Sequence, residues 1–511
     1  MPILGRLRGI LPADVGSADA RAVLLALPAQ AVTPSVPAML RMNASPHRHR
    51  RLSSRRLLRA LPLAWGGALA LTLLALPAPE PGGAASGRAR AAVPAVEVLA
   101  AGDLRGEIHP CGCSPELQWG GLPRRLTFLQ QAQEAAAGNP PIVVDLGNNF
   151  PEPTDQGRLK IDLIQDLLKQ YPPAAILPGP NELAVGLDAL DRGLPYLVSN
   201  DAVGKAFLPE VTVERQGVRI GIYGFLSPEE VYQEFAGQYR LRPVDAVWMT
   251  HVRDRIRATG QARAILLFRG SDAELEALRR AGMFDLIIAG NPFADELNQV
   301  VRRVVAGAVM AQVPTKGQGF HRLPLRLDSA AETPLSEPIW LKETYADHPV
   351  ATHALAIYDD KVKGLFFARL EAMDRNRAES PFAGAAACAA CHVKSSEIWK
   401  ASRHGHALDT LARVKKQFDP ECLQCHVVGL GRNGFLSQDL TPQLGQVQCE
   451  NCHGPAKVHA ADPQHVRTSA IPAGNAEEGG APSVCRICHH GSHSPSFSFA
   501  TYWPKIAHGK D

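Results

Sequence analysis

The sequence predicts a multi-domain protein in which an α/β domain is followed by a smaller, mainly α-helical domain. Three observations lead to this division. Residues 95–328 alternate short apolar runs with helical patterns, the last quarter repeats one cysteine–histidine motif four times, and a basic and then apolar segment lies near the N-terminus. A chain of 511 residues is long enough for two or three domains.

Residues 1–92 are expected to be an upstream segment and an export signal. Six arginines between residues 48 and 59 precede the apolar run 61–76, and alanine-rich residues follow it. This order of basic, apolar and small residues predicts a signal peptide cleaved near residues 84–92. Residues 1–41 lack such a pattern, so Met42 is the expected start. The apolar run is shorter than the roughly 20 residues of a membrane span, and an uncleaved anchor that holds the protein on the membrane is the alternative.

Residues 93–330 are expected to form the α/β domain. Apolar, β-branched runs predict strands at 96–101, 142–146, 174–177, 196–198, 265–268 and 286–289. Apolar positions at helical spacing predict helices at 122–137, 159–170 and 273–281. Residues 211–214 and 219–223 flank Gln216 and Gly217 and predict a hairpin, and 299–327 is rich in strand-forming residues. The alternation predicts a mixed sheet with helices packed on it.

Six short stretches of this domain occur in a recognisable order: Asp103-Leu-Arg-Gly106, Pro110-Cys-Gly-Cys113, Gly120-Gly-Leu-Pro-Arg-Arg125, Val144-Asp-Leu-Gly-Asn148, Gly179-Pro-Asn-Glu182 and Ile287-Ile-Ala-Gly-Asn291. In this order they resemble the calcineurin-like phosphoesterases related to periplasmic five-prime nucleotidases. The resemblance implies this metallophosphoesterase-like family's four-layer α/β sandwich. It also implies a lost two-metal site, because only Asp103 remains of the usual ligands. The other ligand positions hold Arg105, Asn148, Asn181, Arg269, Asn291 and Phe293.

An arginine in a two-metal site places positive charge where the cations would bind. We therefore expect the fold without the hydrolytic chemistry, and a metal-dependent phosphoesterase is the alternative. Cys111 and Cys113 lie in the same domain, one residue apart. They have three interpretations: a tight disulfide, structural thiols in a loop, or ligands of a small metal site near His109. Structural cysteines are preferred.

Residues 331–383 are expected to connect the two domains. Pro334, Pro338 and Pro349 punctuate the start of this segment, and 352–378 has helical spacing of its apolar residues. A flexible linker would be rich in Gly and Ser instead. The segment therefore predicts a packed helical connector.

Residues 384–511 contain four C-x-x-C-H motifs, the spacing of covalent c-type haem attachment. They are Cys388, Cys391 and His392; Cys422, Cys425 and His426; Cys449, Cys452 and His453; and Cys485, Cys488 and His489. Each pair of thiols can form thioethers with one porphyrin, while the adjacent imidazole binds the iron. Zinc ribbons are the alternative, but zinc does not require a histidine after every pair. Four covalent haems on about 124 residues would themselves form the core.

Three further stretches accompany these motifs: Trp399-Lys-Ala-Ser-Arg-His404, Val447-Gln-Cys-Glu-Asn-Cys-His-Gly-Pro455 and Phe499-Ala-Thr-Tyr-Trp-Pro-Lys-Ile-Ala-His508. Together with the motifs they resemble the tetrahaem cytochrome c-554 family. The candidate distal ligands are His404, His406, His459, His465, His490, His493 and His508. The resemblance assigns His404 to the third haem, His459 to the fourth and His508 to the first. His465 and His493 are expected to be surface residues.

The resemblance leaves the second haem without a matched distal histidine. A five-coordinate iron there, with Phe497 or Phe499 covering its distal face, is the prediction; His406, His490 or His493 as sixth ligand is the alternative. We expect an exported, periplasmic electron-transfer protein with redox-protein partners, its α/β domain serving as a scaffold or docking unit. A haem oxidoreductase for small nitrogen or sulfur compounds is the alternative. The net charge of only +4, with dispersed basic residues, argues against nucleic-acid binding.

Overall fold

The computed structural model describes residues 95–110, 118–136, 138–204, 206–235, 237–290, 302–305, 308–327, 338–375, 378–468, 483–489, 494 and 497–508. The expected export signal, Cys111, Cys113, His490 and His493 lie outside these residues. The span Gly87–Asp511 forms one compact unit. Among the described residues, no helix combines the length and the apolar character needed to cross a membrane.

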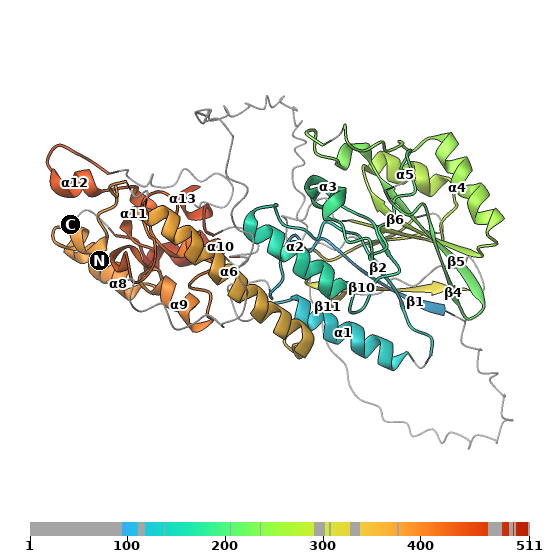
Figure 1. The fold of residues 1–511 in the computed structure, drawn as a ribbon, viewed down its shortest axis with the longest axis horizontal. Coiled ribbons are helices and arrows are strands. Elements are labelled where there is room, and N and C mark those ends of the chain that lie inside the picture. The colour runs from blue at the N-terminus through green and yellow to red at the C-terminus, as the bar shows by residue number, and fades with distance from the viewer. Residues whose placement is uncertain are drawn as a thin grey trace, which may run out of the picture. The chain divides into compact units, whose positions relative to one another are not determined.

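Two β-sheets form the centre of the α/β domain (Figure 1). The first has the order β11 (Pro338–Trp340), β10 (Gly319–Arg326), β1 (Ala95–Ala101), β2 (Ile142–Asp145) and β3 (Ala175–Ile176). The second has the order β4 (Val211–Arg215), β5 (Val218–Leu226), β6 (Arg263–Arg269), β7 (Leu286–Ala289), β9 (Ala308–Gln312) and β8 (Arg302–Val305). In the first sheet, β11, β10 and β1 pair antiparallel, whereas β1, β2 and β3 pair parallel. In the second sheet, parallel pairs from β5 to β9 form the centre, and antiparallel pairs with β4 and β8 flank them. The predicted mixed α/β architecture is confirmed.

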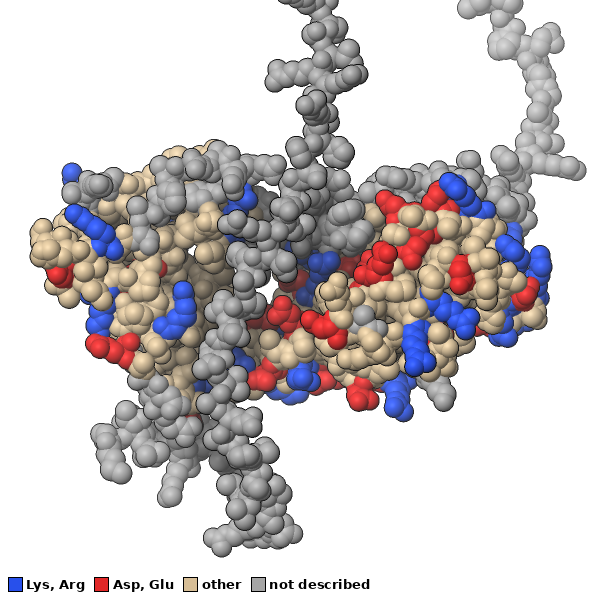
Figure 2. Space-filling model, turned by 90° about the horizontal axis from the view of Figure 1, so that it is seen from above, with Lys and Arg blue, Asp and Glu red and all other residues tan. Residues whose placement is uncertain are grey.

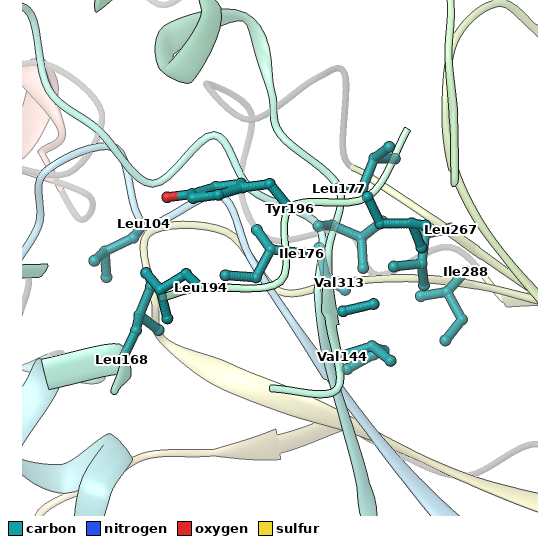
Figure 3. Close-up of a cluster of buried hydrophobic side chains, with 14 of the residues drawn as sticks. Leu104, Val144, Leu168, Ile176, Leu177, Leu194, Tyr196, Leu267, Ile288 and Val313 are labelled. Carbon is teal, nitrogen blue, oxygen red and sulfur yellow. The ribbon is translucent and has the colours of Figure 1, made fainter. Parts of the chain in front are cut away.

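Successive residues of a strand point to opposite faces of its sheet, so each sheet has an inner and an outer face. The inner faces of the two sheets pack against each other. Val144 of β2, Leu267 of β6 and Ile288 of β7 share one buried cluster, part of which Figure 3 shows. The outer face of the first sheet packs on α1 (Leu122–Ala135), and the outer face of the second packs on α4 (Ala246–Ala258) and α5 (Asp272–Arg280). This is the expected four-layer sandwich.

Local sequence signals account for most of these elements. The predicted hairpin is β4–β5, and Gln216 and Gly217 at its turn have φ angles of 52° and 75°. Two such residues suit the twist of a two-residue hairpin. The predicted strand at 196–198 forms only isolated bridges, to Ile176 and Leu208. Helix α4 was not predicted, although Asp245 caps its N-terminus by accepting from the Trp248 amide at 2.7 Å.

The expected connector is α6 (Pro349–Arg375), a helix of 27 residues. Leu355, Tyr358 and Val362 pack in the core of the α/β domain, where α6 lies against α2 (Asp155–Leu168). Phe366, further along the same helix, packs in a different core, which belongs to the C-terminal region. The predicted helix is confirmed, and it begins earlier than predicted, at Pro349.

Short helices form the described part of the C-terminal region. They are α7 (Ala385–Ala389), α8 (Val393–Ala401), α9 (Ala407–Arg413), α10 (Pro420–His426), α11 (Cys449–His453), α12 (Lys457–Ala461), α13 (Ser483–Arg486) and α14 (Phe499–Tyr502). Their protein core is small and centres on Phe435, Leu423 and Val427. This agrees with the mainly α-helical prediction. In the α/β domain, α3 (Pro180–Val185) completes the set of helices.

Candidate haem-binding site

Each C-x-x-C-H motif begins on a helical turn. In the first motif the amide of His392 donates to the carbonyl of Cys388 at 2.9 Å, and in the fourth that of His489 donates to Cys485 at 2.8 Å. The second and third motifs lie within α10 and α11. Residues i, i+3 and i+4 of a helical turn share one face. Both thiols and the imidazole of each motif can therefore reach one macrocycle.

The structure places a second histidine ring beside three of the four motif histidines. His459 lies beside His392 with ring centroids 6.4 Å apart. His404 lies beside His489 at 6.0 Å, and His508 lies beside His453 at 5.9 Å. All three histidines that the cytochrome resemblance nominated as distal ligands are thus paired with a motif histidine.

These separations leave room for a shared metal. An imidazole nitrogen lies about 2 Å from a bound metal, so two imidazoles on opposite sides of one ion have ring centres about 6.3 Å apart. The donor set of two thiols and two facing imidazoles fits a covalently attached, bis-histidine haem at the first, third and fourth motifs.

The pairing itself differs from the expected one. The expectation assigned His404 to the third haem, His459 to the fourth and His508 to the first, whereas the structure puts these residues beside the fourth, first and third motifs. The reason lies in tertiary contacts that the sequence spacing does not reveal. The Val447 amide donates to the carbonyl of His404 at 3.2 Å, which fixes the His404 backbone just before the third motif while its ring faces the fourth.

Hydrogen bonds select the tautomer of the histidine rings. The Nδ1 atoms of His426, His459 and His508 lie 2.7, 2.7 and 2.9 Å from the carbonyls of Ala407, Val466 and Ile506. A carbonyl only accepts, so each Nδ1 carries the hydrogen and leaves Nε2 available for a metal. Ligation also requires the neutral ring. Burial lowers the pKa of His404, with His489 and His426 lowering it further, and burial also lowers the pKa of His426.

Two of the remaining candidates have other partners. His406 Nε2 lies 3.1 Å from the carbonyl of Lys400, and its Nδ1 lies 3.5 Å from Asp409. His465 is 82% exposed and its Nδ1 lies 2.8 Å from Asp462. The expectation of a surface His465 therefore agrees with the structure. Within the described residues, the rings paired with another histidine belong to the first, third and fourth motifs, and His426 of the second motif is not among them.

Phe497 does not lie where the sequence placed it. We expected it, or Phe499, to cover the second haem, but Phe497 stacks on His489 with ring centroids 4.4 Å apart and planes 12° apart. Ser494 Oγ also lies 2.9 Å from His489 Nδ1, so this stretch packs against the fourth motif. Phe499 stacks on Trp503 at 5.2 Å.

Contacts between cysteines order the four motifs in space. The thiol of Cys388 in the first motif hydrogen-bonds Cys449 in the third, and Cys425 in the second hydrogen-bonds Cys488 in the fourth. These contacts lower the pKa of Cys449 and that of Cys425 to about 7. Burial, with a smaller contribution from Cys485 of the fourth motif, raises the pKa of Cys452 to about 11. The motifs thus form a series in the order first, third, fourth, second.

The sequence reasoning missed Glu450, one of the two variable residues of the third motif. It is buried, and its carboxylate accepts from the amides of Ala383, Gly384 and Ala456 at 2.9, 2.8 and 2.7 Å. The neighbouring Gln448 accepts from the Ala385 amide at 2.6 Å. Together they fix the entry to the first motif against the third. A charged residue in the middle of a short buried motif was the available signal.

The guanidinium of Arg269, which stands at a position that the phosphoesterase resemblance assigns to a metal ligand, contacts Asp103. This buried side chain donates to Asp103 Oδ1 at 2.8 Å and to the carbonyl of Leu146 at 2.6 Å. Asn148 Nδ2 donates to the same Asp103 oxygen at 3.1 Å. A Cβ atom at Gly290 would lie 2.6 Å from Arg269 Cζ, so a residue without a side chain is needed there. An internal cation thus neutralises the one carboxylate that the phosphoesterase resemblance retains.

Residues at other positions that the phosphoesterase resemblance singles out also make structural hydrogen bonds. Glu182 accepts from the amides of Asn148 and Asn149 at 2.7 and 2.6 Å, and Asn181 Nδ2 donates to the Phe150 carbonyl at 2.7 Å. Among the described residues, no group of three or more His, Cys, Asp or Glu side chains is placed to hold a metal ion. Asn291 and Phe293 lie outside those residues.

Comparison with known proteins bears on both parts of the chain. Residues 387–454, which span the first three motifs, match the family described as Cytochrome c554 and c-prime. A curated relative, cytochrome c-554 of Nitrosomonas europaea, is 33% identical over 101 residues, covering 17% of this chain and 43% of the relative. The chain therefore spans under half the length of that relative. The cytochrome resemblance is confirmed for this segment.

Solved structures are similar to the other part. A 5'-nucleotidase precursor from Thermus thermophilus has a TM-score of 0.43 and 17% identity, covering 53% of this chain and 59% of its own. The sulfate thiohydrolase SoxB of the same organism has a TM-score of 0.44 and 13% identity, covering 52% of this chain and 60% of its own. The calcineurin-like phosphoesterase YfkN of Bacillus subtilis has a TM-score of 0.40 and 15% identity, covering 52% of this chain and 97% of its own. These likenesses concern the fold.

Proposed function

We propose that this protein is an exported tetrahaem c-type cytochrome that transfers electrons along four closely spaced haems. The observation that carries the proposal is the set of three histidine pairs at 5.9–6.4 Å, each joining a C-x-x-C-H motif to a histidine from another part of the chain. When bound, the haems supply one-electron redox chemistry. The chain's cysteines would attach them, and a pair of histidines would bind the iron at each of three motifs.

The surface supports redox-protein partners over nucleic acid. The face drawn in Figure 2 carries both basic and acidic side chains, in keeping with a net charge of +4. A nucleic-acid-binding protein depends on concentrated positive charge to neutralise phosphates. The export signal expected in residues 1–92 supports a periplasmic location. The four attachment motifs support it as well, because c-type haem is attached outside the cytoplasm.

A second candidate function follows from His426. The other three motif histidines each face another imidazole, whereas within the described residues His426 faces none. An iron with an open sixth position can bind a small ligand, which a bis-histidine iron resists. A haem oxidoreductase acting on small nitrogen or sulfur compounds at the second motif is therefore the alternative to a pure electron carrier.

Haem counting and spin state test both functions on the purified holoprotein. A haemochrome assay after acid–acetone extraction should give about four covalent haems per chain. Electron paramagnetic resonance should give about three low-spin irons and one high-spin iron, with carbon monoxide binding to one iron in four. A colourless protein containing zinc would refute the cytochrome. Four low-spin irons that do not bind carbon monoxide would leave electron transfer and remove the oxidoreductase.

A further inference from the structure

Polar contacts join helix α2 of the α/β domain to the segment that starts the second motif. Gln156 Nε2 donates to Asp419 Oδ1 at 2.8 Å and to the Tyr358 hydroxyl at 3.1 Å. Gln156 and Asp419 are 5% and 8% exposed. Asp419 in turn caps α10 by accepting from the Glu421 amide at 3.0 Å. The contact therefore fixes the start of the helix that carries Cys422, Cys425 and His426.

Two ion-pair contacts surround this buried hydrogen bond. Lys160, one turn further along α2, lies 2.6 Å from Glu421 Oε2, and its side chain is only 12% exposed. Lys416 Nζ lies 2.6 Å from Asp359 Oδ1 on α6 and donates to His109 Nε2 at 2.8 Å. We call Gln156, Lys160 and His109, with their partners Asp419, Glu421 and Lys416, the α2 clamp. It joins three points of the α/β domain to the residues around the start of α10.

The charges of the α2 clamp act on the second motif. Burial raises the pKa of the Cys422 thiol to about 12, and the charged groups that act on it are Asp419, Lys416, Glu421 and Lys160. Cys422 also packs against the apolar core that contains Phe366 and Leu423. Charges interact more strongly across such apolar surroundings than across water. The clamp thus brings a charge of the α/β domain, Lys160, into range of the second motif.

We propose that the α2 clamp positions the second haem motif and sets the reduction potential of the haem attached there. The proposal rests on the proposed attachment at Cys422 and Cys425. The oxidised haem carries one more positive charge than the reduced haem, so a nearby cation favours reduction and a nearby anion favours oxidation. The α/β domain then acts as an electrostatic and positioning partner of one haem.

Neutralising each partner of one ion pair separates electrostatics from structure. Lys160→Gln and Glu421→Gln both break the 2.6 Å contact. If the pair only held the domains together, both changes would have the same effect. If its charges set the potential, Lys160→Gln lowers the midpoint potential of the second haem, and Glu421→Gln raises it. Each shift should be about threefold to tenfold in the oxidised-to-reduced ratio at a fixed potential.

The measurement is a spectroelectrochemical titration of the full-length holoprotein, followed by electron paramagnetic resonance. The second haem is identified as the signal lost in a Cys422→Ala, Cys425→Ala variant. Lys160→Arg should retain the native potential. Lys169→Gln is the matched control, because Lys169 caps the same helix and pairs with Asp166 and Asp191 at 2.8 and 2.7 Å. It should leave all four potentials unchanged.

Three outcomes would overturn the clamp proposal: shifts of the same sign in both variants, equal shifts at all four haems, or no shift. Gln156→Leu gives an independent measure of positioning. It should increase amide hydrogen exchange in α10 while α11 keeps its native protection; unchanged exchange in α10 would contradict positioning. Failure of the proposed function itself is distinguishable. In that case the haemochrome count would not fall from about four to three in the double cysteine variant.

Discussion

Replacing Arg269 with methionine should destabilise the α/β domain strongly. The substitution keeps much of the side-chain volume but leaves the Asp103 carboxylate buried without its cation, and it removes the donor to Leu146. The side chains of Arg269 and Asp103 are 4% and 0% exposed, so water cannot replace the lost partner. Breaking such a buried pair costs about 3–5 kcal/mol. With a urea slope of about 2 kcal/mol per M, the midpoint should fall by about 1.5–2.5 M.

The assay is urea unfolding of the full-length protein, followed by the fluorescence of Trp119, Trp248 and Trp340, which all lie in the α/β domain or at the edge of its first sheet. Asp103→Asn combined with Arg269→Met removes both charges, so the double variant should be more stable than the sum of the two single losses predicts. Arg280→Met, at an exposed i,i+4 pair with Glu276, is the control and should cost less than about 0.5 kcal/mol. Strictly additive losses, or an unchanged midpoint for Arg269→Met, would refute the role of Arg269 as an internal cation.

Three further predictions follow from the same contacts. Burial, Lys416 and Lys160 lower the pKa of His109 to about 3, so the folded protein binds fewer protons there than the unfolded chain. This contribution to stability is complete above about pH 6.5 and decreases as the pH falls toward 3. His109→Gln should therefore reduce the change in the urea midpoint between pH 7 and pH 5. A change as large as that of the native protein would contradict this prediction. His459→Ala should convert the first haem to high spin, whereas His406→Ala should leave the spectrum unchanged, and the reverse result would restore His406 as a ligand. With manganese or zinc added, the protein should release no phosphate from nucleotides or aryl phosphates; turnover that chelator and Asp103→Ala both abolish would overturn this.

The sequence predicted most of the elements because their signals are local. Continuous apolar, β-branched runs indicated the strands at 142–146 and 286–289, and the hairpin at Gln216 and Gly217 needed only a turn that tolerates positive φ. Helix α4 was not predicted because only two of its side chains, Trp248 and Val252, are buried, so the apolar pattern in its sequence is weak. The pairing of distal histidines could not be predicted at all from spacing, because each pair joins segments whose contacts are tertiary.

Arg105 and Arg269 could be recognised in the sequence as residues that oppose cation binding, whereas the contact made by Arg269 could not be predicted. In the structure Arg269 pairs with Asp103, and Gly290 provides room for its guanidinium. That outcome depends on the approach of β6 and β7, which no local pattern encodes.

The three histidine pairs also constrain how the cytochrome region can fold. His404 follows the first motif but faces the fourth, His459 follows the third but faces the first, and His508 near the end of the chain faces the third. No pair of this kind closes within a single motif's own segment, so shared irons would join distant parts of the region. Closing such loops costs chain entropy, which ligation has to offset. The region is therefore expected to reach its native structure only after all four attachment motifs have been made, as one cooperative unit.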